Sequence, residues 1–461
     1  MTAATAAGNA TGGSSAAWTP DVLTTWGRSR YAGTRILAAP AEDSELSSAL
    51  LASSTSPVIV YGSGRCYGDG ALNDGGLTLL SRARQRILAI DRDAGVLVAE
   101  AGASFNDLSA VLHPIGFTYP VAAATGAVTL GGALVNDLHA KNHHSSGSFG
   151  RHVLWFDLMT ADGSVVRCDR VNEPELFEAT IGGLGLTGMV LRVAIRLKPI
   201  RAPAVDASYR RIGDIDEYLD VIENQLHSTF WFGWVDALAR GRHMGRGILE
   251  TGDYAPDDAG TVPAPRIGKL PLPLPTFATH PSVIERYNAR RYDKLPVTGV
   301  RVRKPLAPFY FPLDHIQGYN KVYGRNGFYS VHFGVPQGER SCIKKLLAEV
   351  VAARAGSMAS VLKPMGGSGV GLMSFPIKGY AFALDLPRRT GVEDLHLKLE
   401  RIVLAHGGRL YAAKDALMTA DGFAAMFPNL ERFRAVLRRV DPKGRFQSDM
   451  SRRLRIRPEL A

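Results

Sequence analysis

The sequence has few cysteines and no long apolar run. Its three cysteines, Cys66, Cys168 and Cys342, are far apart in 461 residues. An odd number of distant cysteines argues against a disulfide framework and favours a reducing compartment. No run of about 18 apolar residues is present, so we expect no transmembrane helix. Residues 1–18 lack the basic and apolar regions of a signal peptide, and we interpret them as a flexible tail on a cytoplasmic protein.

Patterns typical of metal sites and nucleic-acid binding are also missing. The segment LHAKNHHSSGSFG (138–150) holds three histidines, but no HExxH motif or cysteine pair accompanies them. His139 and His143 have the spacing of two zinc ligands on a helix, yet the Ser and Gly residues that follow indicate a loop. We therefore predict no metal site, and a His-rich metal-binding protein remains the non-enzyme alternative.

The net charge of +11 points to an anionic partner or to a solvated basic surface, and the sequence leaves both open. Lysines and arginines are spread along the chain, without a basic helix or a recognition motif, so we predict no nucleic-acid partner. With 46% hydrophobic and 21% charged residues, the composition is that of a globular enzyme. The length favours two domains.

The first two hundred residues combine glycine with short β-branched segments. Ser104 is suited to the N-cap of a helix that Gly116 would end. We expect strands at 57–62, 95–102 and 153–163. After residue 200 the character changes: a Pro-rich stretch covers 261–275, and the aromatic segments 228–238 and 304–315 are suited to strands that line a pocket. Amphipathic helices are expected at 341–353 and 393–407.

Three glycine clusters are candidates for a cofactor site. The segment GGLGLTG (182–188) has the spacing of a dinucleotide-binding fingerprint, but a helix precedes it and a strand follows, which is the reverse of the required order. We interpret it as a tight helix-to-strand turn. By contrast, 60–70 follows a strand and presents backbone N–H groups suited to a diphosphate, and 125–144 supplies a second glycine turn.

Together these motifs resemble the vanillyl-alcohol-oxidase type of FAD-linked oxidoreductase. The matching stretches are GRCYGD, VTLGGALVNDLHAKNHHSSGSFG, LMTADG, ELFEATIGGLGLTG, FYFPLD, GGRLYAAKD and DPKGRFQSDMSRRL, in the same order over nearly the whole chain. The resemblance implies an α+β, two-domain FAD-binding fold whose substrate domain is built on an antiparallel sheet. We expect an FAD-binding domain at 19–200, a substrate domain at 201–410 and a C-terminal return to the first domain at 411–461.

The resemblance also assigns residues to the cofactor. Two glycine loops would bracket the FAD diphosphate, and His139 would lie near the flavin. The expected cofactor contacts are Tyr61, Gly62, Ser63, Gly64, Arg65, Cys66, Tyr67, Gly68, Asp69, Thr129, Leu130, Gly131, Gly132, Asn136, Asp137, Leu138, His139, Val190 and Tyr411. Relatives with covalent flavin use a histidine where this chain has Arg65. Closer relatives hold FAD non-covalently and carry serine in place of Cys66, so we predict non-covalent FAD.

Lys414, Lys141 and Tyr67 are the candidate catalytic residues. Alcohol oxidation requires loss of a hydroxyl proton and a hydride, and a lysine can stabilise negative charge on oxygen or, when desolvated, act as a base. Lys363 could meet a substrate phosphate as a point charge. The expected substrate contacts are Asn142, Tyr310, Lys321, Ser330, His332 and Lys363. His143 and His144 are expected to satisfy buried hydrogen bonds.

The resemblance implies oxidation of a secondary sugar hydroxyl, with the 2′-OH of a polyprenyl-phosphate pentose as the best match and the keto product as the first half of an epimerisation. A separate NADH-dependent keto-reductase would complete that reaction. Another sugar, an alditol or an aldonolactone is the alternative substrate, because the sugar-facing residues depart from the family pattern. These departures are Ala124, Lys321, Ser330, His332, Ala381 and Ala383. The basic region 261–305 is a candidate mobile flap for peripheral contact with the inner membrane.

Overall fold

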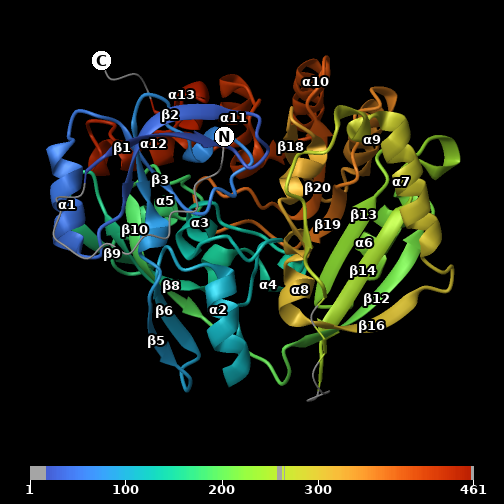
Figure 1. Ribbon diagram of the computed structural model, residues 1–461, viewed down its shortest axis with the longest axis horizontal. Helices are drawn as coiled ribbons and strands as arrows, with labels where there is room; N and C mark the ends of the chain where they lie inside the picture. Colours follow the sequence, from blue (N-terminus) through green and yellow to red (C-terminus); the bar gives the residue numbers. More distant parts are fainter. Residues whose placement is uncertain (1–16, 257–261, 264, 458–461) are drawn as a thin grey trace.

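Three sheets organise the chain into two halves that lie side by side (Figure 1). The computed structural model describes residues 17–256, 262–263 and 265–457. The expected tail, 1–18, therefore falls almost entirely outside the described residues. The α+β class predicted from the sequence is confirmed, and the second half is built on an antiparallel sheet as expected.

The first half holds two sheets. A mixed sheet has the order β1-β2-β4-β3, and an antiparallel sheet has the order β5-β6-β10-β8-β9. The strands are β1 (Thr19–Thr24), β2 (Tyr31–Ala38), β3 (Val58–Tyr61), β4 (Leu77–Leu80), β5 (Ile87–Asp91), β6 (Val96–Glu100), β8 (Val153–Met159), β9 (Val165–Asp169) and β10 (Met189–Arg196). Strands β7 (Phe117–Thr118) and β11 (Lys198–Pro199) form a short pair. The helices are α1 (Asp43–Ala52), α2 (Phe105–Leu112), α3 (Leu130–Val135), α4 (His143–Ser146) and α5 (Pro174–Thr180).

Local sequence signals explain the ends of these elements. The Ser104 hydroxyl accepts a hydrogen bond from Asp107 N–H, and the Asp107 carboxylate accepts one from Ser104 N–H, so α2 begins with a reciprocal cap. Gly116, with φ of 79°, ends the short helix that follows. Both ends were predicted. The turn at 182–188 joins α5 to β10, as its sequence indicated.

The second half is an eight-stranded sheet with the order β16-β12-β14-β13-β19-β20-β18-β21, and every pairing in it is antiparallel. Its strands are β12 (Ala204–Ile212), β13 (Phe230–Val235), β14 (Gly247–Tyr254), β16 (Val300–Pro305), β18 (Phe328–Pro336), β19 (Ser360–Met365), β20 (Gly379–Pro387) and β21 (Arg409–Leu410). Its helices are α6 (Ile215–Asn224), α7 (Pro281–Lys294), α8 (Leu306–Tyr310), α9 (Arg340–Ala352) and α10 (Val392–Ala405). Strands β15 (Gly268–Lys269) and β17 (Ile316–Gln317) form a separate parallel pair.

One expectation for this half was wrong. The aromatic segment 304–315 is mostly not a strand, because β16 ends at Pro305 and α8 and a 3₁₀ turn follow. Pro308 and Pro312 lack the N–H that a ladder requires, which outweighs the β preference of the aromatic residues. The region 261–305, our candidate mobile flap, contains α7 and β16, and β16 pairs with β12. The other aromatic segment is a strand, β13.

The C-terminal segment returns to the first half. Val58 N–H donates to Arg445 O at 2.7 Å, and Gln447 N–H donates to Val58 O at 3.0 Å. Helices α11 (Ala420–Met426), α12 (Leu430–Val440) and α13 (Asp449–Arg453) follow β21 and lie beside the first strands (Figure 1). The end of the chain is thereby tied to the strand that precedes the first glycine loop.

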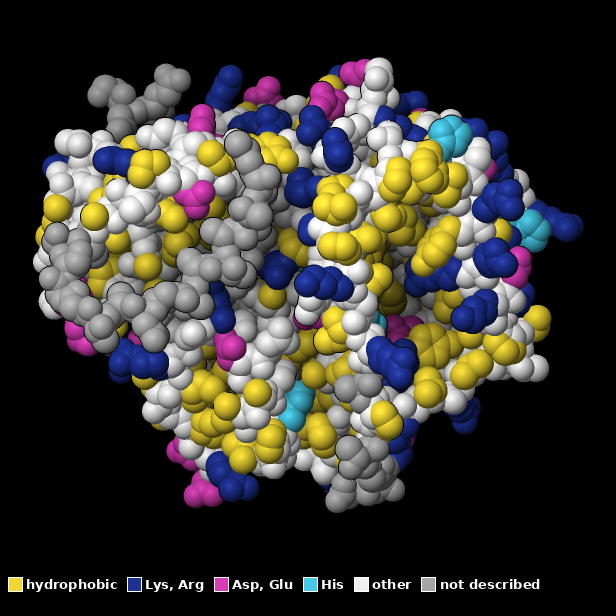
Figure 2. Space-filling view, viewed as in Figure 1, with side chains coloured by type: hydrophobic (Ala, Val, Ile, Leu, Met, Phe, Trp, Pro, Cys, Tyr) yellow, Lys and Arg dark blue, Asp and Glu magenta, His cyan; other side chains and the backbone are white. Residues whose placement is uncertain are grey.

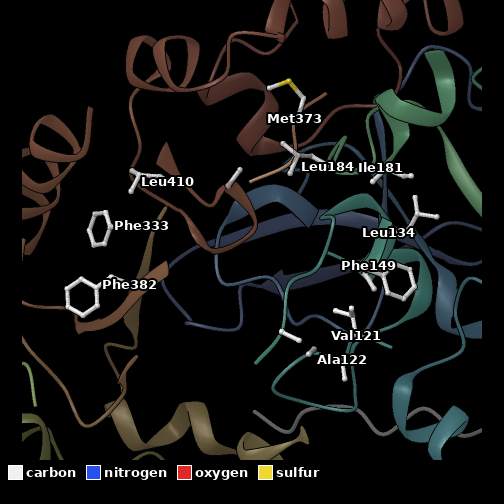
Figure 3. Packing of buried hydrophobic residues seen from close by; sticks show 14 of the residues in the cluster. Val121, Ala122, Leu134, Phe149, Ile181, Leu184, Phe333, Met373, Phe382 and Leu410 are labelled. Carbon is white, nitrogen blue, oxygen red and sulfur yellow. The ribbon is translucent and has the colours of Figure 1, made fainter. Parts of the chain in front are cut away.

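One apolar core runs through both halves. Leu134 and Ile181 of the first half belong to the same buried cluster as Phe333 and Phe382 of the large sheet (Figure 3). Burial of this surface fixes the glycine loops relative to the sheet that faces them. No helix among the described residues is long and apolar enough to cross a membrane.

Candidate active site

A large cavity lies where the two halves meet, and it gathers most of the predicted site residues. Its walls come from the loop after β3, from α3 and the histidine loop, and from the face of β13, β18, β19 and β20. The predicted residues that line it are Gly62, Ser63, Gly64, Arg65, Cys66, Tyr67, Thr129, Gly131, Gly132, Asn136, Leu138, His139, Lys141, Asn142, Val190, Tyr310, His332, Lys363, Tyr411 and Lys414.

Seven predicted site residues lie outside this lining: Tyr61, Gly68, Asp69, Leu130, Asp137, Lys321 and Ser330. Asp69 and Asp137 are buried. Asp69 accepts a hydrogen bond from Arg453, and Asp137 accepts one from Ser374. The Lys321 amine donates to Pro271 O, away from the cavity. Ser330 is buried on β18 directly opposite Asp385 of β20, whose side chain does reach the cavity.

The first glycine loop leaves room and hydrogen-bond donors for an anion. No described residue accepts a hydrogen bond from the backbone N–H groups of residues 63–66. Gly64 has φ of 64°, and a Cβ on Gly62 would lie only 2.9 Å from Thr129 Oγ1. Side chains are therefore excluded where the loop approaches α3. Consecutive free N–H groups in such a loop fit a diphosphate.

The second glycine segment forms the opposite wall. Thr129 caps α3 by accepting a hydrogen bond from Gly132 N–H at 3.1 Å. A Cβ on Gly131 would lie 3.1 Å from the Ala101 Cβ, so this turn also packs closely. Tyr411, from the C-terminal return, donates to Asn136 O at 2.9 Å. The cavity is thus closed by segments from three distant parts of the sequence.

The turn at 182–188 has a role that its motif did not reveal. Leu184, Gly185 and Gly188 line the cavity, next to Val190 at the start of β10. A Cβ on Gly188 would lie 2.3 Å from Met159 O. The turn joins a helix to a strand, as we interpreted it, and it also borders the cavity.

Two neutral histidines occupy the sheet end of the cavity. The rings of His139 and His332 lie 4.8 Å apart, edge to face. Burial, together with the neighbouring lysines Lys363 and Lys414, holds the pKa of both histidines well below the ordinary value. Neither ring nitrogen of His332, nor Nδ1 of His139, has a hydrogen-bond partner among the described residues. Buried polar atoms of this kind fit a polar ligand, so the site suits a flavin and a sugar.

Lys414 lines the cavity beside aromatic and acidic groups. Its amine lies 4.6 Å from the centre of the Tyr67 ring, which stabilises a cation. Burial lowers the pKa of Lys414, and the charge of Asp385 opposes that shift. Asp415, the neighbour that would pair with a surface lysine, instead contacts His396 and Arg453. The structure therefore places Lys414 in the cavity and not in a surface ion pair.

Lys141 is held by a partly buried acid that sequence analysis missed. Its amine donates to Glu250 Oε2 at 3.0 Å and to Phe309 O at 3.0 Å. Tyr209 donates to the other oxygen of Glu250. Glu250 lies on β14 directly opposite Tyr209 of β12 and Phe232 of β13. The pKa of Glu250 is low: burial alone would raise it, but the charge of Lys141 lowers it.

Cys66 and Arg65 occupy the first loop. Burial and the nearby Asp69 raise the pKa of the Cys66 thiol to about 12. A thiol with that pKa is protonated at neutral pH and is a poor nucleophile. The Arg65 guanidinium lies over Trp26, at 4.2 Å from the ring centre.

The other two histidines of the loop make buried hydrogen bonds, as expected. Gly366 N–H donates to His143 Nδ1 at 3.2 Å, and His144 Nε2 lies 2.9 Å from Ser228 O. Among the described residues, no group of three or more His, Cys, Asp or Glu is arranged to hold a metal ion.

We expect His143→Asn to remove part of the acid sensitivity of the fold. Burial lowers the pKa of His143 to about 3, so between pH 6.5 and 3 the unfolded state binds a proton that the folded state does not. Stability from this group is complete above pH 6.5 and is lost as pH falls, by up to about 1.4 kcal/mol per pH unit. Asn can accept the Gly366 hydrogen bond without titrating. Urea unfolding from pH 7 to 4 should show a shallower loss, whereas His227→Gln, at an exposed position, should keep the parent slope.

Comparison with known proteins finds two matching families and several relatives. The FAD binding domain family matches residues 34–169, and the D-arabinono-1,4-lactone oxidase family matches residues 382–454. The chain is 35% identical over 413 residues to decaprenylphosphoryl-β-D-ribose oxidase of Mycolicibacterium smegmatis, covering 87% of this chain and 89% of that protein. It is 30% identical to L-gulonolactone oxidase of Scyliorhinus torazame over 39% of this chain and 41% of that protein. It is also 30% identical to Δ(24)-sterol reductase of Rattus norvegicus over 25% of this chain and 22% of that protein.

Proposed function

The chain belongs to the FAD-linked oxidoreductase family that includes decaprenylphosphoryl-β-D-ribose oxidase, and from this we propose that it oxidises the 2′-OH of a polyprenyl-phosphate pentose to a ketone. The chain is an FAD-dependent oxidoreductase acting on a sugar hydroxyl. The observation that carries the proposal is the cavity itself, which joins a glycine loop with free backbone N–H groups to a sheet end with three lysines and unpartnered histidines.

The two glycine segments would hold FAD. The free N–H groups of residues 63–66 suit its diphosphate, and the aromatic and histidine side chains at the sheet end suit its ring system. When bound, FAD supplies the two-electron acceptor for alcohol oxidation. Lys414 would stabilise negative charge on the substrate oxygen, and Tyr67 would hold the Lys414 ammonium over its ring.

The substrate test is anaerobic bleaching of the flavin. We expect a short-chain polyprenyl-phosphoryl ribose to remove the yellow absorbance of the holoenzyme. L-Gulonolactone, D-arabinono-1,4-lactone and simple alditols should do so at least tenfold more slowly. The match to a lactone oxidase family in residues 382–454 favours these as the second candidates. Faster bleaching by a lactone or an alditol would overturn the pentose proposal and keep the reaction class.

We expect the flavin to be released by acid. The Cys66 thiol is protonated and Arg65 cannot form the bond, so precipitation with trichloroacetic acid should leave the yellow colour in the supernatant. Colour in the pellet would contradict non-covalent binding. Cys66→Ser would then show whether Cys66 carries the link.

The surface around α7 is our candidate for contact with an anionic membrane. Exposed apolar side chains include Leu272 at 73%, Phe277 at 70% and Val297 at 82%. Hydrophobic and basic side chains lie side by side over α7 (Figure 2). The basic residues of this stretch are Arg266, Lys269, Arg286, Arg290, Arg291, Lys294, Arg301, Arg303 and Lys304, against the acids Glu285 and Asp293. Apolar tips among cations suit an anionic bilayer surface, where a polyprenyl substrate would reside.

We expect this membrane contact to depend on the apolar tips. The double variant Leu272→Ser, Phe277→Ser should cosediment at least fivefold less with vesicles that contain anionic lipid. The matched double variant Val22→Ser, Val171→Ser changes equally exposed residues elsewhere and should behave like the parent. Equal sedimentation with neutral and anionic vesicles would contradict the proposal.

The keto product implies a second enzyme. A hydride must be returned to the ketone to complete an epimerisation, and we propose that a separate NADH-dependent reductase performs that step. The cytoplasmic location inferred from the sequence stays a prediction.

A further inference from the structure

We propose that Lys363, and not Lys414, is the base that takes the proton from the substrate hydroxyl. This inference rests on the proposed oxidation and deepens it by assigning the proton acceptor. It comes from a comparison of the three lysines that line the cavity, Lys141, Lys363 and Lys414.

The three amines differ in what surrounds them. Lys141 is paired with the Glu250 carboxylate at 3.0 Å. The Lys414 amine lies 4.6 Å from the centre of the Tyr67 ring, and the charge of Asp385 raises its pKa. Lys363, on β19, has only the Ala140 carbonyl oxygen, at 3.3 Å. No described carboxylate lies within 4.0 Å of the Lys363 amine, although the side chain is buried, with the residue 8% exposed.

A buried ammonium without an anion is unfavourable, so the neutral amine is the stable form. Burial, with the charges of Lys414 and Lys141, holds the pKa of Lys363 well below its ordinary value of 10.5. The pKa of Lys414 is also lowered by burial, but there the charge of Asp385 pulls in the opposite direction. When their environments push the pKa values of two neighbouring amines apart, one amine can accept a proton while the other stays a cation.

The proposed step couples a proton transfer to the oxidation of the alcohol. The substrate O–H bond breaks and its proton forms a new N–H bond at the Lys363 lone pair. The C–H bond at the same carbon also breaks as the C=O double bond forms, and FAD, when bound, would supply the acceptor for that hydrogen and its electron pair. The Lys414 ammonium faces the oxygen while negative charge develops on it. This assignment replaces the phosphate-binding role that the sequence suggested for Lys363, because a phosphate contact would require a charged amine.

Other groups that titrate also face Lys363, so a pH profile alone would be ambiguous. These groups are Lys141, His139, His143, His332 and Lys414. The protonation state must therefore be observed at Lys363 itself.

The first measurement is NMR of the FAD-loaded protein with ¹³Cε-labelled lysine, in which the Lys363 signal is identified by its loss in Lys363→Arg. We expect this signal to be that of a free amine at pH 7.5 and to titrate well below pH 10.5. The signal of the exposed Lys344 should persist in Lys363→Arg and serves as the internal control for the assignment. A Lys363 signal that remains that of an ammonium up to pH 10 would overturn the proposal without any measurement of activity.

The second measurement is anaerobic flavin reduction by a short-chain polyprenyl-phosphoryl ribose. Lys363→Met and Lys363→Arg, which cannot accept a proton at this pH, should slow reduction by about 10²–10⁴-fold. The affinity for the keto product should change less than about fivefold if only proton transfer is lost. Ethylamine should restore part of the rate in Lys363→Ala, whereas it should not affect Lys344→Met. Full-speed reduction in Lys363→Met would refute the base assignment; failure of the parent enzyme to be reduced would refute the proposed substrate instead.

Discussion

Lys414→Met should slow anaerobic reduction of the flavin by about 10²–10³-fold while the protein still purifies with FAD. The side chain lines the cavity, and its amine is the cation that we place beside the substrate oxygen. Methionine has a similar volume, so the cavity is preserved while the charge is removed. Rapid mixing with substrate under anaerobic conditions measures the rate, and the visible spectrum measures the FAD content.

Asp385→Asn tests the charge of the Lys414 ammonium in a second way. Asp385 raises the pKa of Lys414 against the effect of burial, so its removal should lower that pKa further. The ammonium would then be lost at lower pH, and the alkaline limb of the reduction rate should move to lower pH. Lys414→Arg, which keeps a cation, should retain more activity than Lys414→Met. Equal rates in Lys414→Met and the parent, with substrate saturating, would show that the ammonium has no part in the chemistry.

Local signals predicted what depends on local geometry. Ser104 marks the start of α2, and Gly116 marks the end of the 3₁₀ helix that follows it, because a cap and a left-handed residue act within one turn. The first glycine loop follows a strand, and no described residue accepts a hydrogen bond from its N–H groups at 63–66. The histidine segment is mostly a loop for the reason that its Ser and Gly residues suggested, with one short helix in it.

Features that depend on strand register could not be predicted. Glu250 meets Lys141 because β14 pairs with β12 and β13 in one particular register, and a shift by one residue would turn it to the other face. Asp385 reaches the cavity for the same reason, from the strand opposite Ser330. Lys321 appeared to be a pocket residue in sequence, but its short 3₁₀ segment directs it to Pro271. The aromatic residues of 304–315 suggested a strand, but the prolines of this segment disfavour one, and α8 and a 3₁₀ turn form there instead.

Arg453→Met should have the largest effect on stability, because Arg453 joins the first glycine loop to the segment that carries Lys414. Its guanidinium contacts Asp69 at 2.7 and 3.0 Å and Asp415 at 3.1 Å. Asp69 and Asp415 are 3% and 2% exposed. Burial alone would raise the pKa of Asp415, but His396 and Arg453 hold it below the ordinary value. Removing the cation leaves two buried carboxylates short of a partner, which costs about 3–5 kcal/mol.

Urea unfolding at pH 7.5 measures this loss, with Arg432→Met as the matched control. Arg432 forms an ion pair with Glu178 at the surface, with a nitrogen–oxygen distance of 3.8 Å. Such a surface ion pair contributes at most about 1 kcal/mol to stability. The Arg453 variant should also lose FAD more readily, because Tyr67 N–H donates to Ala413 O and the loop and the lysine segment move together. A loss below about 1 kcal/mol with normal FAD retention would mean that close packing between Gly68 and the Asp415 carbonyl, and not the buried charges, holds the two segments in place.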